Sequence, residues 1–264
     1  MVSLLDRMRG QSNVARPAEP EPEPEEFYKE MTLQEHLAEL RTRLIYSVLA
    51  VAVGFVIGLA LAFPALHLIE RMSGLNNLQA ISPTEPFIVY TKVALYIGFA
   101  FAMPVIIYQL IRFLAPGLTR KERYYLFRAL PFVTLMFVAG VLFAFFVLVP
   151  RALDFLSHFG SGVFRADFRA QEVISFYLTL LLWVGVVFET PIVIYLLVRL
   201  GIVSVKRLAS FRRLAVVIVM VIAAIITPTP DPFNMMLVAA PMYLLFELGL
   251  LLGRFARPPE RRSS

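Results

Sequence analysis

Glu189 is the residue of this sequence that most needs a chemical explanation. It lies inside Val173–Val198, a run that is otherwise almost entirely apolar, and Pro191 follows shortly after it. A carboxylate near the centre of a membrane helix costs about 2.5–3.5 kcal/mol on insertion scales, so such residues are rare and usually functional. Proline removes a backbone hydrogen bond and bends the helix that contains it. The pair therefore predicts a bent helix with a polar site inside a bilayer.

Two further polar side chains are expected in the same half of the membrane. Gln109 lies at the inner end of the second apolar segment, and Glu247 lies past the middle of the last one. Polar groups at this depth either hydrogen-bond a neighbouring helix as a packing contact or belong to a functional site. For Gln109 and Glu247 the sequence leaves both interpretations open.

The other potentially reactive residues are not arranged in a pattern typical of a metal, phosphate or catalytic site. His36, His67 and His158 fall on different segments without the spacing of metal ligands, and cysteine is absent. The sequence contains no phosphate-binding glycine loop and no evident pairing of a nucleophile with a base. We therefore expect no metal, no cofactor, no nucleic-acid partner and no enzymatic activity.

The composition places most of these residues in lipid. Of the 264 residues, 59% are hydrophobic and only 17% are charged, and the mean hydropathy is +0.74. A soluble domain of this length could not hide so much apolar surface from water. The start, Met1–Gly10, lacks a long apolar core with a cleavage site, so no cleavable signal peptide is expected.

Six apolar segments predict an all-α polytopic membrane protein with six transmembrane helices. The fifth segment is short for a span, and we expect its neighbours to shield its ends or the bilayer to thin around it. The segments are Leu44–Phe63, Phe87–Ile111, Ala129–Pro150, Val173–Val198, Leu214–Thr227 and Phe233–Leu252.

The distribution of lysine and arginine predicts the orientation. Of the 25 Lys and Arg residues, 20 lie in the terminal segments 1–43 and 254–264 and the connections 112–128 and 199–213, which share one side of the membrane. Because cytoplasmic connections carry the excess of positive charge, both termini are expected to be cytoplasmic. Residues 1–30 are rich in Pro and Glu and should form a disordered tail. Residues 31–254 form the predicted membrane domain, and 255–264 form a basic tail.

The segment before the first span has helical periodicity of its own. We expect an interfacial helix with an apolar stripe of leucines, and Thr32 with Glu35 fit a capping box at its start. Glu39 and Arg43 are four residues apart and would form an ordinary surface ion pair. The leucines are Leu33, Leu37, Leu40 and Leu44.

The connections on the opposite side predict further local structure. Pro83 and Pro86 predict an extended entry to the second span, and Lys92 is expected to reach outward from its first turns. A short surface helix is expected near Leu153–Phe159. Asp231 precedes the last span and is expected to cap it.

Six short motifs in this order resemble the TatC family, the core membrane component of the twin-arginine (Sec-independent) protein translocase. The resemblance runs from about Met31 to Arg254. The motifs are His36–Arg41 (HLAELR), Pro83–Lys92 (PTEPFIVYTK), Met103–Arg123 (MPVIIYQLIRFLAPGLTRKER), Phe188–Pro191 (FETP), Thr227–Asp231 (TPTPD) and Pro241–Glu247 (PMYLLFE). The individual positions that match are His36, Pro86, Phe87, Lys92, Pro116, Gly117 and Asp231.

The resemblance implies a receptor for signal peptides that carry paired arginines on folded cargo. It implies that Glu39 and Glu122 face the arginines, with Arg41, Gln109 and Phe113 near the same site. Guanidinium binds carboxylate through two parallel hydrogen bonds, which lysine cannot reproduce.

The resemblance also implies the fold, the partners and the location. It implies a concave bundle with short fifth and sixth helices, and Glu189 lining its cavity. The expected partners are single-span Tat proteins, the lipid bilayer and further copies of the chain. The expected location is a prokaryotic cytoplasmic membrane, with transport driven by the proton motive force.

Two other functions are compatible with parts of the sequence. An ion-coupled small-molecule transporter would use Glu189 as its proton site, but it predicts two related repeats, and residues 44–150 and 173–252 differ in span length and connections. A purely structural scaffold leaves the acid inside the membrane unexplained.

Overall fold

A computed structural model describes residues 33–73, 79–115, 120–159, 168–227 and 231–256. The regular structure of these residues is helical, with short connections and one isolated bridge between Gln79 and Arg169. The Pro/Glu-rich tail, Thr32 of the expected capping box, Pro116 and Gly117 lie outside these ranges. The helices are α1 (Leu33–Ser73), α2 (Glu85–Leu114), α3 (Arg120–Phe143), α4 (Val149–His158), α5 (Ala170–Val187), α6 (Thr190–Arg199), α7 (Val205–Ser210), α8 (Arg212–Ile226) and α9 (Pro232–Phe255).

Each of the six predicted segments is largely helical in the structure. Within the described residues, five helical stretches are long and apolar enough to cross a membrane. They correspond to α1, α2, α3 continued into α4, α5 with α6, and α9. The predicted fifth span is α8, whose 15 residues make it shorter than α9 with 24 and α1 with 41. The all-α architecture is therefore confirmed, and the six-helix count agrees with it.

The start of α1 differs from the expected interfacial helix. Leu33–Ser73 is one helix, because no helix-breaking residue precedes Pro64. Its polar side is turned inward: His36, Glu39 and Arg43 are half-buried against α2. The expected leucine stripe faces outward, and Leu33 is 84% exposed. Where lipid surrounds a protein, apolar side chains are stable outside and polar ones find partners inside.

Two of the predicted connections are also helical. The expected surface helix near Leu153–Phe159 is α4, and a π-helical turn, Ala144–Leu148, joins it to α3 without interruption. The expected extended entry at Pro86 is wrong, since Pro86 lies in the first turn of α2. Proline suits that position because its fixed φ is helical and the N–H it lacks would have no helical partner.

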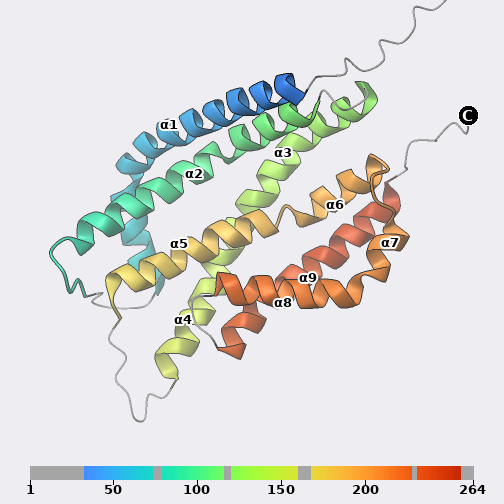
Figure 1. The fold of residues 1–264 in the computed structure, drawn as a ribbon. Coiled ribbons are helices and arrows are strands. Elements are labelled where there is room, and N and C mark those ends of the chain that lie inside the picture. Colours follow the sequence, from blue (N-terminus) through green and yellow to red (C-terminus); the bar gives the residue numbers. More distant parts are fainter. Residues whose placement is uncertain (1–32, 74–78, 116–119, 160–167, 228–230, 257–264) are drawn as a thin grey trace, which may run out of the picture.

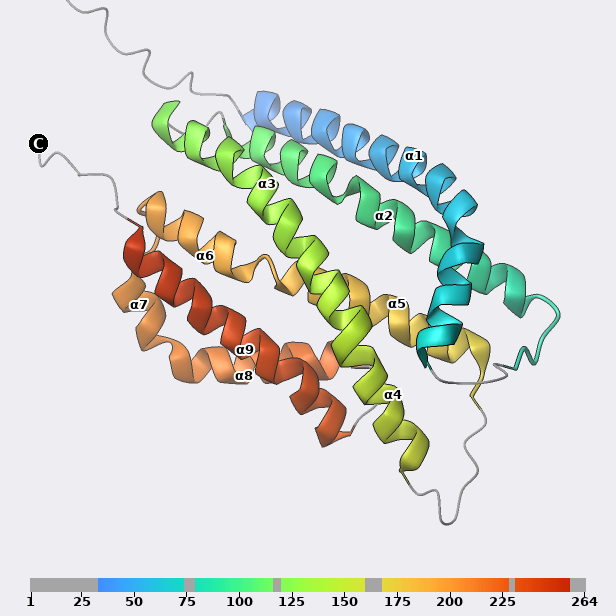
Figure 2. The same ribbon diagram turned by 180° about the vertical axis from the view of Figure 1, so that it is seen from behind.

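Close backbone contact holds α1 against α2. A Cβ atom on Gly98 would lie 2.5 Å from the backbone N of Phe55, and one on Gly54 would overlap the carbonyl oxygen of Gly98. Small residues at such a seam let two membrane helices approach closely. The hydroxyl of Tyr90 also donates a hydrogen bond to the carbonyl oxygen of Leu59 at 2.7 Å. The two helices lie side by side in both views (Figures 1 and 2).

The fourth span is broken at the position that Glu189 and Pro191 predict. Helix α5 ends at Val187 and α6 begins at Thr190, with Phe188 and Glu189 in a turn between them. Helix α5 packs on α2 and α3, whereas α6 packs mainly on α9 (Figure 1). The two halves of this span therefore belong to different packing units, and Glu189 lies where they join.

Candidate functional site

A polar cluster joins α1 to α2 near the end of the bundle where α1 begins, α2 ends and α3 begins (Figures 1 and 2). We call this the basic end. Arg43 donates from Nη2 to Glu39 Oε1 at 3.1 Å and from Nη1 to Gln109 Oε1 at 3.4 Å. The Glu39 and Arg43 side chains are only 14% and 21% exposed. The expected surface ion pair is therefore a half-buried link between two helices.

Two atoms of this cluster have unused hydrogen-bonding capacity. Glu39 Oε2 and Arg43 Nε are buried and have no hydrogen-bond partner among the described residues. Leaving such a group unpaired away from water costs free energy. The cluster therefore offers one carboxylate oxygen whose side chain is oriented by Arg43 and which can accept a hydrogen bond from a guanidinium.

An aromatic contact lies beside the cluster. The rings of His36 and Phe113 stack with their centroids 4.4 Å apart and an interplanar angle of 24°. His36 precedes Glu39 by about one turn of α1, and Phe113 follows Gln109 by about one turn of α2. The two helices thus present an aromatic pair and a charged cluster along one seam.

The remaining residues predicted for this site are not all in the cluster. Arg41 is exposed on α1 and takes no part in the contacts of Glu39, Arg43 and Gln109 described above. Glu122 lies half-buried in the first turn of α3, at the same end of the bundle (Figure 2). The structure therefore joins Glu39 to Gln109 through Arg43, which sequence reasoning had treated as a surface residue. Its spacing from Glu39 was the available signal.

The two intramembrane acids have different surroundings. Glu189 Oε1 is buried at the α5–α6 turn without a hydrogen-bond partner among the described residues. Glu247 on α9 accepts from Arg212 of α8 at 2.7 Å and from the hydroxyl of Tyr243 at 2.9 Å. For Glu247 these contacts favour the packing interpretation. Gln109 is bonded to Arg43, and Glu247 to Arg212 and Tyr243, so the hydrogen bonds among the described residues do not join Glu189 to either side chain.

The other family-motif residues have structural surroundings. Asp231 caps α9 as expected, because its Oδ1 accepts the backbone N–H of Asn234 at 2.7 Å. Lys92 does not reach outward as expected: it is half-buried and donates to the hydroxyl of Ser175 on α5 at 3.1 Å. A helix-to-helix hydrogen bond satisfies the ammonium group without a path to the membrane surface. Phe87 is exposed at the start of α2.

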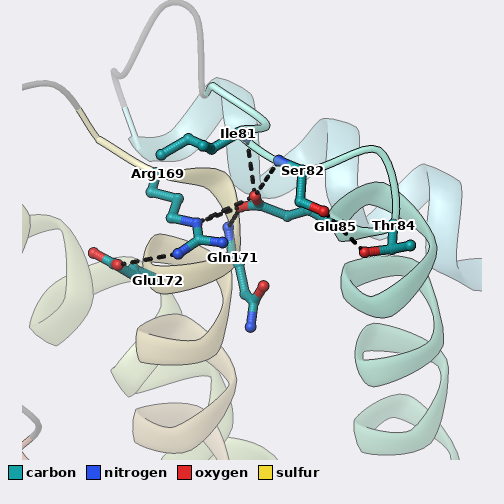
Figure 3. Close-up of polar contacts among 7 residues, drawn as sticks. All are labelled: Ile81, Ser82, Thr84, Glu85, Arg169, Gln171 and Glu172. Atoms are coloured by element: carbon teal, nitrogen blue, oxygen red, sulfur yellow. Dashed lines mark hydrogen bonds and ion pairs between the residues drawn. The ribbon is translucent and has the colours of Figure 1, made fainter.

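Sequence reasoning missed a buried carboxylate at the opposite end of α2. Glu85 is only 1% exposed and joins three chain segments (Figure 3). It accepts hydrogen bonds from the backbone N–H groups of Ile81, Ser82 and Gln171 at 3.0, 3.4 and 2.9 Å. Arg169 Nε lies 3.1 and 3.2 Å from its two oxygens. The carboxylate is therefore saturated with hydrogen-bond donors. Its role is to hold chain segments together rather than to bind a ligand.

Within the described residues no group of three or more His, Cys, Asp or Glu side chains could hold a metal ion. The cysteine-free sequence adds no thiolate elsewhere.

Comparison with known proteins relates this chain to protein translocases. The family model for the Sec-independent protein translocase protein (TatC) matches residues 35–241. The Sec-independent protein translocase protein TatC of Carboxydothermus hydrogenoformans is 37% identical over 234 residues, which cover 88% of this chain and 96% of that protein. The protein TatCy of Bacillus subtilis is 35% identical, covering 89% of this chain and 93% of the relative.

A solved structure has the same fold. The crystal structure of the twin-arginine translocase receptor TatC superposes on this chain with a TM-score of 0.75 and 38% sequence identity. The match covers 84% of this chain and 99% of that one.

Proposed function

The chain belongs to the TatC family of Sec-independent protein translocase components, and from that premise we propose that it is a membrane receptor for twin-arginine signal peptides. In this proposal it recognises the signal peptide of a folded protein and then nucleates the translocon with single-span Tat partners and further copies of itself. Transport is driven by the proton motive force. The chain lies in a prokaryotic cytoplasmic membrane, and its basic end and both termini are cytoplasmic.

One observation carries the proposal: the unpaired oxygen of Glu39. Arg43 holds Oε1 at 3.1 Å and fixes the carboxylate, while the buried Oε2 has no partner among the described residues. A peptide guanidinium that hydrogen-bonds Oε2 satisfies this oxygen with a charge-assisted bond. Since the carboxylate is already held in place, little side-chain entropy is lost on binding.

The second arginine of the peptide is assigned to Glu122 in this proposal. Glu122 is the first acid of α3 and lies at the same end of the bundle as Glu39 (Figure 2). The stacked pair of His36 and Phe113 provides an apolar surface at the seam. The apolar stretch of the signal peptide then lies along the bundle toward Glu189.

The proposal is tested with purified full-length protein in nanodiscs and a fluorescent twin-arginine peptide. Removing the charge with Glu39→Gln keeps the side-chain shape but loses a charge-assisted hydrogen bond, which contributes about 1.5–3 kcal/mol. We expect Kd to rise by roughly 10- to 150-fold. Glu122→Gln should also weaken binding. The matched control is Glu35→Gln, since Glu35 is an exposed acid in the first turn of α1. Wild-type affinity in Glu39→Gln, or equal loss in Glu35→Gln, contradicts the assignment.

The ion-coupled transporter considered above rests on the unpaired Glu189 oxygen alone. It predicts proton-coupled solute uptake by liposomes that contain only this chain, and Glu189→Gln should abolish that uptake. The receptor proposal predicts no such uptake.

A further inference from the structure

Two groups of arginines among the described residues differ in what the guanidinium contacts. Arg43, Arg169 and Arg212 each form an ion pair with a carboxylate on the same or a neighbouring helix, as Figure 3 shows for Arg169. In a second group, Arg112, Arg128 and Arg199, the guanidinium lies over a tyrosine ring. Arg112 and Arg128 are not paired with a carboxylate in the described part of the chain.

Arg112 and Arg128 lie at the basic end, on the last turn of α2 and in the first turns of α3. The guanidinium of Arg112 lies 5.4 Å from the ring centroid of Tyr108, and that of Arg128 lies 4.9 Å from that of Tyr124. Tyr108 contacts Phe127 edge-to-face at 5.7 Å, which brings the two helices together there. Ring faces hold the cations in place and leave their charge uncompensated.

Each cation continues an apolar stripe on its own helix. On α3, Arg128 shares a face with Phe132 and Leu135, which are 63% and 65% exposed, and with Leu142. At 1.5 Å per residue this stripe is about 21 Å long. On α2, Arg112 shares a face with Tyr108, Val105 and Phe101, a stripe about 16 Å long by the same rise. One leaflet of hydrocarbon is about 15 Å thick, so each stripe covers the depth of a leaflet.

From this arrangement we propose that the face formed by Arg112, Tyr108, Arg128, Tyr124 and the two apolar stripes binds an anionic phospholipid. The phosphate lies between the two guanidinium groups, which suit it because their planar N–H edges match phosphate oxygens. The acyl chains lie along the stripes. Tyrosine suits this depth because its ring is apolar and its hydroxyl polar.

The experiment uses full-length protein purified in detergent, with phosphatidylglycerol and phosphatidylcholine of identical acyl chains as probes. Native mass spectrometry reports the lipid retained, and thermal unfolding reports stabilisation. We expect the wild type to prefer phosphatidylglycerol by at least about tenfold, the effect of one charge-assisted hydrogen bond. The double variant Arg112→Gln/Arg128→Gln should reduce this preference to less than about twofold.

A matched control removes the same charge from the same end of the bundle. Arg207 and Arg254 are exposed in the last turns of α7 and α9. The variant Arg207→Gln/Arg254→Gln should keep the wild-type preference. Equal loss in both double variants would show that only net charge matters and would overturn the proposal, as would full preference in Arg112→Gln/Arg128→Gln.

A lysine variant and a soluble head-group probe complete the experiment. The variant Arg112→Lys/Arg128→Lys retains the charge and should fold even if the glutamine variant does not. We expect it to lose at least half of the preference, because lysine lacks the planar fork; full retention contradicts the geometry. Glycerol phosphate, the head group without acyl chains, should give no stabilisation. Stabilisation equal to that of phosphatidylglycerol would show a soluble-anion site and overturn the lipid assignment.

Discussion

Adding one methyl group at Gly98 tests the α1–α2 seam that positions the Glu39 cluster. In Gly98→Ala the new Cβ lies 2.5 Å from the backbone N of Phe55 and 2.7 Å from the backbone C of Gly54. Comfortable carbon contacts begin near 3.5 Å, so the helices must separate by about 1 Å. Both atoms are backbone atoms of another helix and cannot rotate away, which favours the upper part of the usual overpacking cost of about 1–3 kcal/mol.

Helix propensity acts in the opposite direction. Alanine is more favourable than glycine inside a helix by about 0.8–1.0 kcal/mol. The expected net effect of Gly98→Ala is therefore a destabilisation of about 1–2 kcal/mol, or a fall in Tm of roughly 2–8 °C for a chain of this size. Separation by about 1 Å also takes the Arg43–Gln109 contact, now 3.4 Å, beyond hydrogen-bonding range. Twin-arginine peptide binding should weaken in the same variant.

The assay is thermal unfolding in detergent, followed through Trp183, the only tryptophan, with peptide binding measured on the same samples. The control is Ala52→Leu, which adds a larger side chain to an exposed position of α1 and should leave Tm and binding unchanged. A higher Tm for Gly98→Ala would mean that propensity dominates and would refute the close contact between the helices.

Three more substitutions have defined outcomes. Glu85→Gln places an amide N–H against one of the hydrogen-bond donors around this side chain, so Tm should fall. In a double-mutant cycle, Arg169→Gln should lower Tm less in the Glu85→Gln background than in the wild type. Additive effects would contradict the interaction between Glu85 and Arg169. Asp231→Ala removes the cap of α9 and should cost about 1 kcal/mol in the free energy of unfolding, measured by denaturant titration, whereas no change would show that the cap is dispensable. Tyr243→Phe removes one donor to Glu247 but keeps the 2.7 Å ion pair with Arg212, so Tm should change much less than in Arg212→Gln, and an equal change would contradict that ranking.

Local patterns predicted much of the fold. Hydropathy located all six helical segments, and Glu189 with Pro191 located the break between α5 and α6. Asp231 was recognised as a cap because capping depends on residues a few positions apart. These features depend on interactions between residues that are close in the sequence, so the sequence alone can predict them.

Contacts between distant segments could not be predicted in this way. Glu85 and Arg169 are 84 residues apart, and Lys92 and Ser175 are 83 apart, so periodicity says nothing about their meeting. The expectation for Arg43 failed for another reason. The periodicity correctly separates a polar and an apolar face on the first helix. The polar face was expected to contact water, but in the structure it contacts helix α2.

The most direct test of the receptor assignment compares two peptides on two proteins. A twin-arginine signal peptide and its twin-lysine counterpart are titrated onto the wild type and onto Glu39→Gln in nanodiscs. We predict that the wild type prefers the arginine peptide by at least about tenfold, since lysine cannot form the bidentate contact, and that this preference largely disappears in Glu39→Gln. Equal affinity of the wild type for both peptides, or an undiminished preference in Glu39→Gln, would contradict the proposal that the unpaired oxygen of Glu39 binds a signal-peptide arginine.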